Sequence, residues 1–354
     1  MSGGRGSPPP AAPPPAVGSL AAMRTSLSEL LATGRPLLAD GATGTNYFAA
    51  GLTSGEPPEF WTVDHPDRVK GLHQQFVDAG SDIILTNTFG CNAKRLQLHK
   101  AEARVHELAA GAARLAREVA DAAPHPVVVG GSVGPTGELF EPLGKLTHDD
   151  AVAVFREEIR GLKDGGADVI WIETMSAIEE FHAAAEAAIA EGMPYTVTCS
   201  FDTAGRTMMG LLPDQFAATL ADLPQPPLAI GANCGVGASD TLVSVLSMEG
   251  AEPVLVSKAN CGVPQFQGTE VVYSGTPDLM ATYAGLAVDA GARIIGGCCG
   301  TSPDHIAAMR RALDAHTAGE RPTIDTIVDA IGPLTNAAPS AGGSERTRRR
   351  NRGE

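Results

Sequence analysis

The sequence predicts a single-domain (β/α)8 TIM barrel, and three observations carry that prediction. Between about residues 36 and 316, eight short apolar, β-rich runs alternate with stretches of helical spacing. Most of these runs are continuously apolar, as expected for strands that are buried on both faces of a parallel sheet. No Gly-rich dinucleotide fingerprint follows the first run, so the alternative of a doubly wound open sheet is disfavoured. Eight strand–helix units favour the closed barrel.

The strands are expected where the apolar runs lie. In chain order they are Pro36–Asp40, Ile83–Asn87, Pro126–Ser132, Asp168–Glu173, Tyr195–Ser200, Leu228–Asn233, Pro253–Ser257 and Arg293–Gly296. The stretches between them repeat apolar residues at helical spacing, as Val69, Leu72 and Phe76 do after the first strand. Each strand is thus followed by a helical stretch that can cover the barrel.

Composition and charge narrow the class of protein. The 354 residues are 43% hydrophobic, which supports a sizeable core, and their net charge of −15 argues against nucleic-acid or anionic-membrane partners. No apolar run approaches the roughly 20 residues of a transmembrane helix, and the proline-rich start does not resemble a secretory signal. Six cysteines without such a signal indicate the reducing cytoplasm, where clustered cysteines point to a metal or to catalysis.

The chain divides into three parts. We expect residues 1–24 to form a disordered Pro/Gly/Ala-rich extension, residues 25–320 to form the barrel, and residues 321–354 to form a C-terminal extension with a disordered basic end. The arginines of that end, between residues 346 and 352, leave an interaction tail as the alternative.

Three thiols lie at predicted strand ends. Cys234 follows the sixth strand, and the adjacent Cys298 and Cys299 follow the eighth. In a barrel the carboxyl ends of the strands build the active site, so these thiols can converge. Three thiolates match a zinc site with one open position. A buried cysteine pair or a vicinal disulfide stays open as an alternative, and Cys261 or Cys91 is a candidate fourth ligand.

Two carboxylates end otherwise apolar strands. Asp40 closes the first strand and Glu173 closes the fourth, and each needs a cation, an amino group or backbone donors as a partner. The alternative is that they cap the loops that follow. No HExxH motif occurs, and the absence of GxSxG and P-loop motifs argues against a serine hydrolase or a P-loop NTPase.

The motifs ADGATGT, LTNTFG, GSVGPTG, WIET, GANCG and GGCCGTSP, in this order, resemble the homocysteine S-methyltransferase family. The resemblance covers roughly residues 36–316 and is greatest to the bacterial betaine–homocysteine S-methyltransferases. It implies Zn²⁺ as cofactor, methyl transfer to homocysteine with methionine as product, and a homo-oligomer. The zinc ligands it implies are Cys234, Cys298 and Cys299. The amino-acid-binding residues it implies are Asp40, Gly41, Thr86 and Glu173.

Zinc chemistry accounts for the missing general base. A free alkyl thiol has a pKa of about 8.5, and coordination to zinc deprotonates it outright. A methyl group on a positively charged nitrogen or sulfur can then be displaced in line. Glu173 is therefore expected to orient the substrate without taking a proton.

The resemblance points to betaine as the methyl donor, although the expected aromatic cage is incomplete. The betaine enzymes of animals place tyrosines just after the second and fourth strand motifs, where this chain has Gly90 and Thr174. Trp61 is the first substitute for a donor contact. The further candidates are Phe60, Phe89 and Phe140. S-methylmethionine, dimethylsulfoniopropionate and a methyl-corrinoid protein remain alternative donors. A non-catalytic zinc-stabilised barrel remains the alternative of another class.

Overall fold

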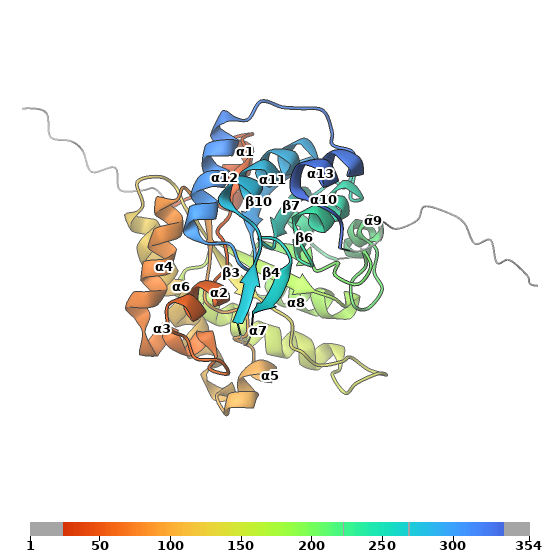
Figure 1. Cartoon of the computed structure of the whole chain (residues 1–354). Coiled ribbons are helices and arrows are strands. Elements are labelled where there is room, and N and C mark those ends of the chain that lie inside the picture. The colour runs from red at the N-terminus through yellow and green to blue at the C-terminus, as the bar shows by residue number, and fades with distance from the viewer. Residues whose placement is uncertain (1–23, 222, 268–269, 336–354) are drawn as a thin grey trace, which may run out of the picture.

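The computed structural model describes residues 24–221, 223–267 and 270–335. Its eight-stranded parallel sheet has the order β1-β10-β7-β6-β5-β4-β3-β2. A parallel bridge between Ala39 and Ile83 joins the two ends of this order and closes the sheet into a barrel. The predicted (β/α)8 TIM barrel is confirmed, with helices around the strands (Figure 1).

Every barrel strand falls on a predicted run. The strands are β1 (Leu37–Leu38), β2 (Ile83–Leu85), β3 (Val128–Val133), β4 (Val169–Met175), β5 (Tyr195–Cys199), β6 (Ala229–Cys234), β7 (Val254–Ala259) and β10 (Ala292–Gly297). Strand β7 runs past its predicted end at Ser257, because Lys258 and Ala259 continue its parallel pairing with β6 and β10.

Long helices cover the outside of the barrel and short ones fill the loops. The longer helices are α4 (Pro66–Asp78), α6 (Val105–Ala122), α7 (His148–Gly165), α8 (Ile178–Ala190), α10 (Ala238–Leu246), α11 (Pro277–Asp289), α12 (Pro303–Ala315) and α13 (Ile324–Ile331). The shorter ones are α1 (Leu27–Ala32), α2 (Gly44–Ala49), α3 (Trp61–Asp64), α5 (Ala93–Leu96) and α9 (Pro213–Phe216), with 3-10 turns η1 (Pro58–Phe60), η2 (Gln97–His99), η3 (Glu102–Arg104) and η4 (Ala217–Leu220).

Helix α1 covers the amino-terminal opening of the barrel. Its buried residues Leu27 and Leu30 belong to one apolar cluster with barrel residues such as Leu37, Val128 and Ile294. The helix begins with a capping box between Ser26 and Glu29, which satisfies its first backbone N–H groups. The opposite, carboxyl-terminal end of the barrel is left for the site.

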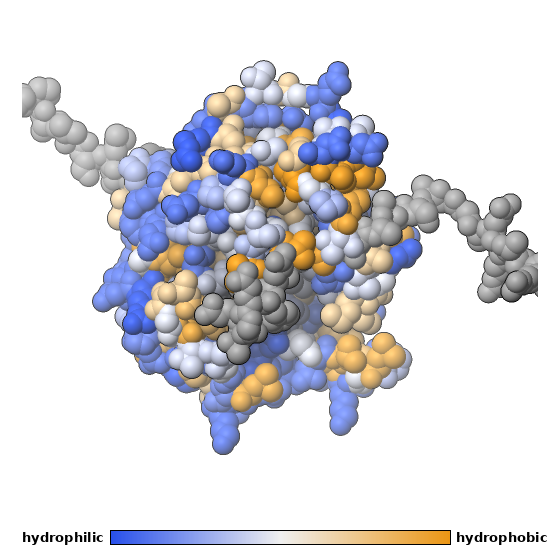
Figure 2. Space-filling view, viewed as in Figure 1, coloured by the Kyte–Doolittle hydropathy of each residue, from blue (hydrophilic) through white to orange (hydrophobic). Residues whose placement is uncertain are grey.

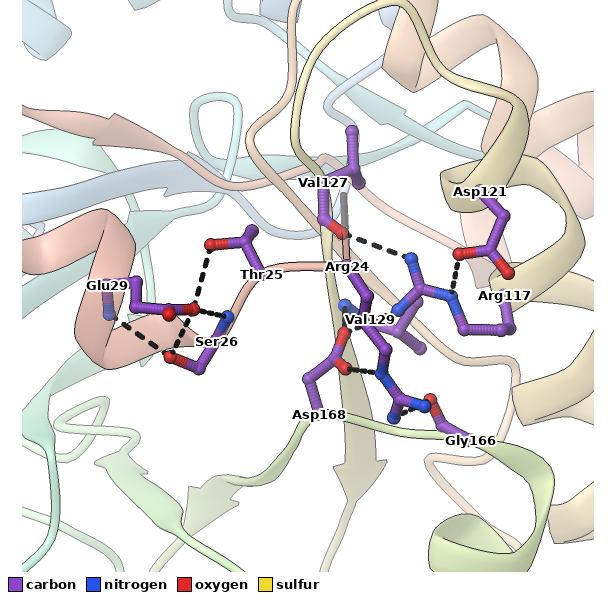
Figure 3. A network of polar contacts seen from close by, with 10 residues as sticks. All are labelled: Arg24, Thr25, Ser26, Glu29, Arg117, Asp121, Val127, Val129, Gly166 and Asp168. Carbon is purple, nitrogen blue, oxygen red and sulfur yellow. Dashed lines mark hydrogen bonds and ion pairs between the residues drawn. The ribbon is translucent and has the colours of Figure 1, made fainter. Parts of the chain in front are cut away.

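An ion network fixes the chain at the same amino-terminal end (Figure 3). Asp168, directly before β4, accepts hydrogen bonds from Arg24 Nε at 2.8 Å, from an Arg117 guanidinium N–H at 2.7 Å and from Val129 N at 2.8 Å. Residue 24, the last of the predicted disordered extension, thus has a defined partner. Residues 1–23 lie outside the described residues.

Helix α13 and a hairpin were not expected from the sequence. Helix α13 lies in the predicted C-terminal extension, yet it packs against α10 and α11 and buries Ile327 completely. Between β7 and α11, strands β8 (Pro264–Gln267) and β9 (Glu270–Tyr273) form an antiparallel hairpin, drawn in cyan in Figure 1. The predicted disordered basic end, from residue 336 onward, lies outside the described residues.

Exposed apolar side chains gather on the loops after the strand ends. The large ones there are Phe48, Phe89, Leu98, Leu139, Leu143, Ile178, Met208, Met209, Val263 and Val272, and we call them the apolar rim. They follow β1, β2, β3, β4, β5 and β7 in the chain and therefore lie near the carboxyl-terminal end of the barrel. Figure 2 shows small apolar groups separated by hydrophilic surface. No helix among the described residues is long and apolar enough to span a membrane.

Candidate active site

The three predicted thiols meet at the carboxyl-terminal end of the barrel. The sulfur atoms of Cys234, Cys298 and Cys299 all lie within 4.8 Å of one another, and those of Cys234 and Cys299 are 4.0 Å apart. Two thiolates on one tetrahedral zinc ion lie about 3.8 Å apart, given Zn–S bonds of about 2.3 Å. A disulfide would need about 2.05 Å between sulfurs. The spacing therefore fits three thiolate ligands of a metal and does not fit a disulfide.

The local backbone turns these thiols inward. Cys234 ends β6 with a φ of 59°, in the left-handed region that a non-glycine residue seldom adopts. Such a conformation costs about 1–3 kcal/mol and persists where the surroundings enforce it. After β10, Cys298 N donates to the carbonyl oxygen of Ala259 at 2.7 Å. This hydrogen bond holds the vicinal pair against β7.

Asn260 ties the two cysteine segments together. Its Oδ1 accepts the N–H of Cys299 at 2.9 Å, and its Nδ2 donates to the carbonyl oxygen of Gly235 at 2.7 Å. The side chain is almost completely buried. One amide therefore fixes the distance between the loops that carry Cys234 and Cys299. Asn260 was not among the site residues expected from the sequence.

Asn233 fixes the neighbouring loop in the same way. Its Oδ1 accepts from Thr174 N at 2.8 Å and from the Thr198 hydroxyl at 2.7 Å, and its Nδ2 donates to Thr174 Oγ1 at 2.7 Å. Like Cys234, Thr174 has a left-handed backbone, with a φ of 61°. The bonds from Asn233 hold this strained residue beside the thiols.

The three thiols perturb one another strongly. Hydrogen bonds from Cys234 and then Cys298 lower the pKa of Cys299 to about 3, whereas contacts with Cys298 and then Cys299 raise the pKa of Cys234. Packing several thiols this closely in a buried place favours a cation that can neutralise them.

The remaining cysteines lie elsewhere. Among the described residues, the only group of cysteine, histidine or carboxylate side chains with metal-ligand spacing is the cluster of three. Cys91 is buried with its sulfur 3.6 Å from the carbonyl oxygen of Val105, and Cys261 is also completely buried. The geometry therefore gives neither of them the place of a fourth ligand.

A cavity of about 650 Å³ opens beside the thiols. Its lining includes Cys234, Cys298 and Cys299 together with Gly41, Thr86, Ser132, Glu173 and Lys258. Three of the four predicted amino-acid-binding residues thus line the cavity that contains the thiols. The fourth, Asp40, lies behind the lining and is 1% exposed.

Glu173 offers one carboxylate oxygen to the cavity. Its Oε1 accepts a hydrogen bond from the Ser132 hydroxyl at 2.6 Å. Burial raises the pKa of Glu173 to about 7, while the positive charge of Lys258 opposes that rise. A carboxylate held in this way can accept hydrogen bonds from an ammonium group.

Asp40 forms an ion pair inside the barrel. Its Oδ1 lies 2.9 Å from Lys258 Nζ, and its Oδ2 accepts the N–H of Leu85 at 2.7 Å. Both side chains are almost completely buried. Asp40 thus has the partners that its burial requires. Lys258, which provides the charge, was missed from the sequence because strand β7 was expected to end before it.

Gly41 and Thr86 shape the wall of the cavity. A Cβ at Gly41 would lie 2.5 Å from the carbonyl oxygen of Thr301, so only glycine allows this close approach of the first and last barrel loops. Thr86 Oγ1 lies 2.7 Å from the hydroxyl of Thr88 and accepts the N–H of Ser132 at 3.0 Å. Thr86 therefore connects the loops after β2 and β3.

Trp61 does not line this cavity. The indole is 1% exposed, packs on Tyr47 with ring centroids 5.1 Å apart and lies under the guanidinium of Arg68. Phe60 and Phe140 are also absent from the cavity lining. The phenylalanines that do line the cavity are Phe48 and Phe89. The geometry thus favours Phe89 over Trp61 among the aromatic residues considered from the sequence.

Comparison with known proteins places the chain in a family. The family model described as "Homocysteine S-methyltransferase" matches residues 37–313. Methionine synthase of Mycobacterium leprae is 31% identical over 87% of this chain and 27% of its own length. Methionine synthase of Mycobacterium tuberculosis is 30% identical over 90% of this chain and 29% of its own length. The chain thus spans less than a third of these relatives.

Solved structures agree with this placement. The homocysteine methyltransferase MmuM from Escherichia coli, in both its oxidized and its metallated form, is 26% identical to this chain, with a TM-score of 0.68. The match to the metallated form covers 80% of this chain and 99% of MmuM. A homologue of this fold therefore binds a metal.

Proposed function

The chain belongs to the homocysteine S-methyltransferase family, and from that premise we propose that it transfers a methyl group to the sulfur of L-homocysteine, giving L-methionine. The observation that carries the proposal is the convergence of three thiols on one cavity. Such a cavity brings a soft metal site and a pocket for a thiol substrate together. The expected cofactor is Zn²⁺, held by Cys234, Cys298 and Cys299.

The donor set supports zinc on chemical grounds. Thiolates are soft ligands that select zinc over the hard cations magnesium and calcium. With three protein ligands, zinc would keep one position open and there hold the substrate sulfur as a thiolate. Asn260 and Asn233 would keep the protein ligands in place.

Glu173 is proposed to bind the ammonium group of homocysteine. Its Oε1 is fixed by Ser132, so its second oxygen can face the substrate. No proton transfer is required of it, because the substrate sulfur is already a thiolate when the methyl group arrives. Gly41 and Thr86 are proposed to form the wall against which the amino-acid end lies.

Betaine is proposed as the methyl donor, with dimethylglycine as co-product. A quaternary ammonium is attracted to aromatic faces, and Phe89 and Phe48 line the cavity. The carboxylates of Glu56 and Glu59, also in the lining, would favour a positively charged donor. Phe89 replaces Trp61 as the proposed donor contact. S-methylmethionine and dimethylsulfoniopropionate carry the same positive charge and remain alternative donors.

A methyl-corrinoid protein is an alternative donor of a different kind. It would have to dock on the carboxyl-terminal end of the barrel to reach the thiols. Exposed side chains of the apolar rim, such as Leu139, Leu143 and Met208, would lie in its path. This alternative changes the donor and keeps homocysteine as the acceptor.

A homo-oligomer and a cytoplasmic location, where thiols stay reduced, are further expectations from the sequence.

Methionine formation tests the proposal. The zinc-loaded protein is incubated with homocysteine and each of the four donors in turn, and methionine is quantified. We expect methionine with betaine, and none after chelation of the metal. Methionine with another donor alone would overturn only the choice of betaine. No methionine with any donor would favour the non-catalytic zinc-stabilised barrel.

A further inference from the structure

Lys258 is a buried cation to which the proposed function gives no role. It lies on β7 inside the barrel, with its side chain 2% exposed, and it belongs to the cavity lining. Burial by itself would lower the pKa of Lys258, but the carboxylates of Asp40 and then Glu173 outweigh burial and raise it. The cavity therefore contains a fixed positive charge close to the thiols.

One donor of this ammonium group is unused. A lysine ammonium has three N–H donors. Nζ of Lys258 donates to Oδ1 of Asp40 at 2.9 Å and to the carbonyl oxygen of Asp40 at 3.1 Å. Within the described part of the chain, no third acceptor lies at hydrogen-bond distance from Nζ. Because Lys258 lines the cavity, its third N–H is available to a molecule bound there.

The surroundings are built to hold the lysine in this position. A Cβ at Gly296 would lie 3.0 Å from Cγ of Lys258 and 3.1 Å from the carbonyl oxygen of Asp40, so glycine keeps this space open for the lysine stem. Asp40 is fixed in turn by the N–H of Leu85. The ammonium group therefore has little freedom to move away from the cavity.

The cavity has opposite polarity at two places. Glu173 presents an acceptor, since among the described residues only its Oε1 has a hydrogen-bond partner, and Lys258 presents a donor. An amino acid has an ammonium and a carboxylate on one carbon atom, so it can satisfy both at once. A carboxylate in so buried a place is stabilised by a charged partner of this kind.

We propose that Lys258 binds the α-carboxylate of homocysteine while Glu173 binds its ammonium group. This inference rests on the proposed function and deepens it, because it restricts the acceptor to thiols that carry both charges at the far end. Asp40 then acts as a positioning residue that holds Lys258. Its own carboxylate oxygens are engaged with the lysine and with Leu85.

The test compares three thiols on the zinc-loaded protein by calorimetry. They are homocysteine, aminopropanethiol, which lacks the carboxylate, and sulfanylbutanoate, which lacks the ammonium group. The wild-type protein should bind homocysteine about 10- to 100-fold more tightly than either analogue, as charged hydrogen bonds of about 1.5–3 kcal/mol imply. In Lys258→Met the preference over aminopropanethiol should fall to about threefold or less, and the preference over sulfanylbutanoate should stay.

Glu173→Gln is the matched control. It should lose the preference for homocysteine over sulfanylbutanoate and keep the preference over aminopropanethiol. Metal analysis should find zinc in both variants. The double variant Asp40→Asn/Lys258→Met removes both charges of the buried pair, so it avoids an unpaired carboxylate and should show the same loss as Lys258→Met. Each preference is the ratio of two affinities measured on the same protein, so a smaller fraction of folded protein affects both affinities equally and leaves the ratio unchanged. A wild-type preference over aminopropanethiol in both lysine variants would overturn the inference. Absence of binding of all three thiols to the wild-type protein would instead overturn the proposed function.

Discussion

At the scale of single residues, the proposed metal site involves side-chain amides as well as thiols. Asn260 bonds the backbone at both Cys299 and Gly235, and so joins two loops that come from different strands. Groups that orient metal ligands typically contribute about 10- to 100-fold to metal affinity. The contribution of Asn260 can be measured separately from that of the thiols.

Replacing Asn260 should weaken zinc binding. We expect Asn260→Ala to lower zinc affinity by about 10- to 100-fold, measured by competition with a coloured chelator. Asn260→Asp is the matched variant, because its carboxylate can still accept the N–H of Cys299 but cannot donate to Gly235. The zinc affinity of Asn260→Asp should lie between those of the wild type and of Asn260→Ala. Equal affinity in all three proteins would show that the loops hold the thiols without this amide.

The raised pKa of Glu173 predicts a pH dependence of substrate binding. Burial raises this pKa to about 7, so the carboxylate gains a proton as the pH falls through 7 and can no longer pair with an ammonium group. The KM for homocysteine should therefore rise below pH 7 in the wild type. In Glu173→Gln the KM should be higher throughout and rise less steeply below pH 7. If KM changed with pH in the same way in both proteins, Glu173 would not be the residue that pairs with the ammonium group.

The residue scale is also where sequence-based prediction was least complete. The three thiols were recognisable because each follows a buried strand, and such strand ends meet at one end of a barrel. Lys258 was not recognisable, since its partner Asp40 lies 218 positions away in the chain. A lysine after an apolar run is usually a solvated strand end, and only closure of the barrel brings these two charges together. Trp61, chosen from its type alone, packs outside the cavity.

At the scale of elements, helix α13 belongs to the packed part of the molecule. Ile327 and Ile331 face α10 and α11, and the carbonyl oxygen of Gly332 accepts a hydrogen bond from the Ser239 hydroxyl at 2.7 Å. Helix α10 follows β6 and Cys234 directly. A helix read from the sequence as part of a loose extension thus supports an element that carries a site residue.

Two isoleucines of α13 provide a matched pair for testing this packing. Ile327 is fully buried, and Ile324 is 38% exposed. We expect Ile327→Ala to lower the free energy of unfolding by about 2–5 kcal/mol, because it leaves a cavity. Ile324→Ala should change it by less than about 1 kcal/mol. Urea denaturation measures both, and equal effects would mean that α13 is not docked as described.

The strands were predictable and the hairpin was not. A parallel strand in a barrel is buried on both faces, which gives the continuous apolar runs that located all eight. Strands β8 and β9 lie outside the barrel and pair only with each other, so no continuous apolar run marks them. For α13, the chain after α12 reads as polar and proline-containing before the helix begins at Ile324.

At the scale of the whole molecule, a buried histidine predicts how stability depends on pH. His73 of α4 is 2% exposed, its Nε2 has no hydrogen-bond partner among the described residues, and burial lowers its pKa from 6.5 to about 4. The unfolded chain therefore binds a proton between pH 6.5 and 4 that the folded protein excludes. Stability should fall as the pH drops through this window, by up to about 3 kcal/mol.

A substitution at the same position isolates that contribution. His73→Gln cannot take up the proton, so its loss of stability between pH 7 and pH 4.5 should be smaller than that of the wild type. Urea midpoints at the two pH values give the comparison. The same loss in both proteins would assign the acid sensitivity to other groups.

The whole barrel forms the site, because the proposed metal ligands come from β6 and from the loop after β10, and the charged residues near them come from β4, from β7 and from the loop after β1. The most direct test of the account is zinc K-edge X-ray absorption of the purified protein with and without homocysteine. We predict three sulfur ligands at about 2.3 Å without homocysteine and four with it. An unchanged sulfur count on saturation with homocysteine would contradict the account.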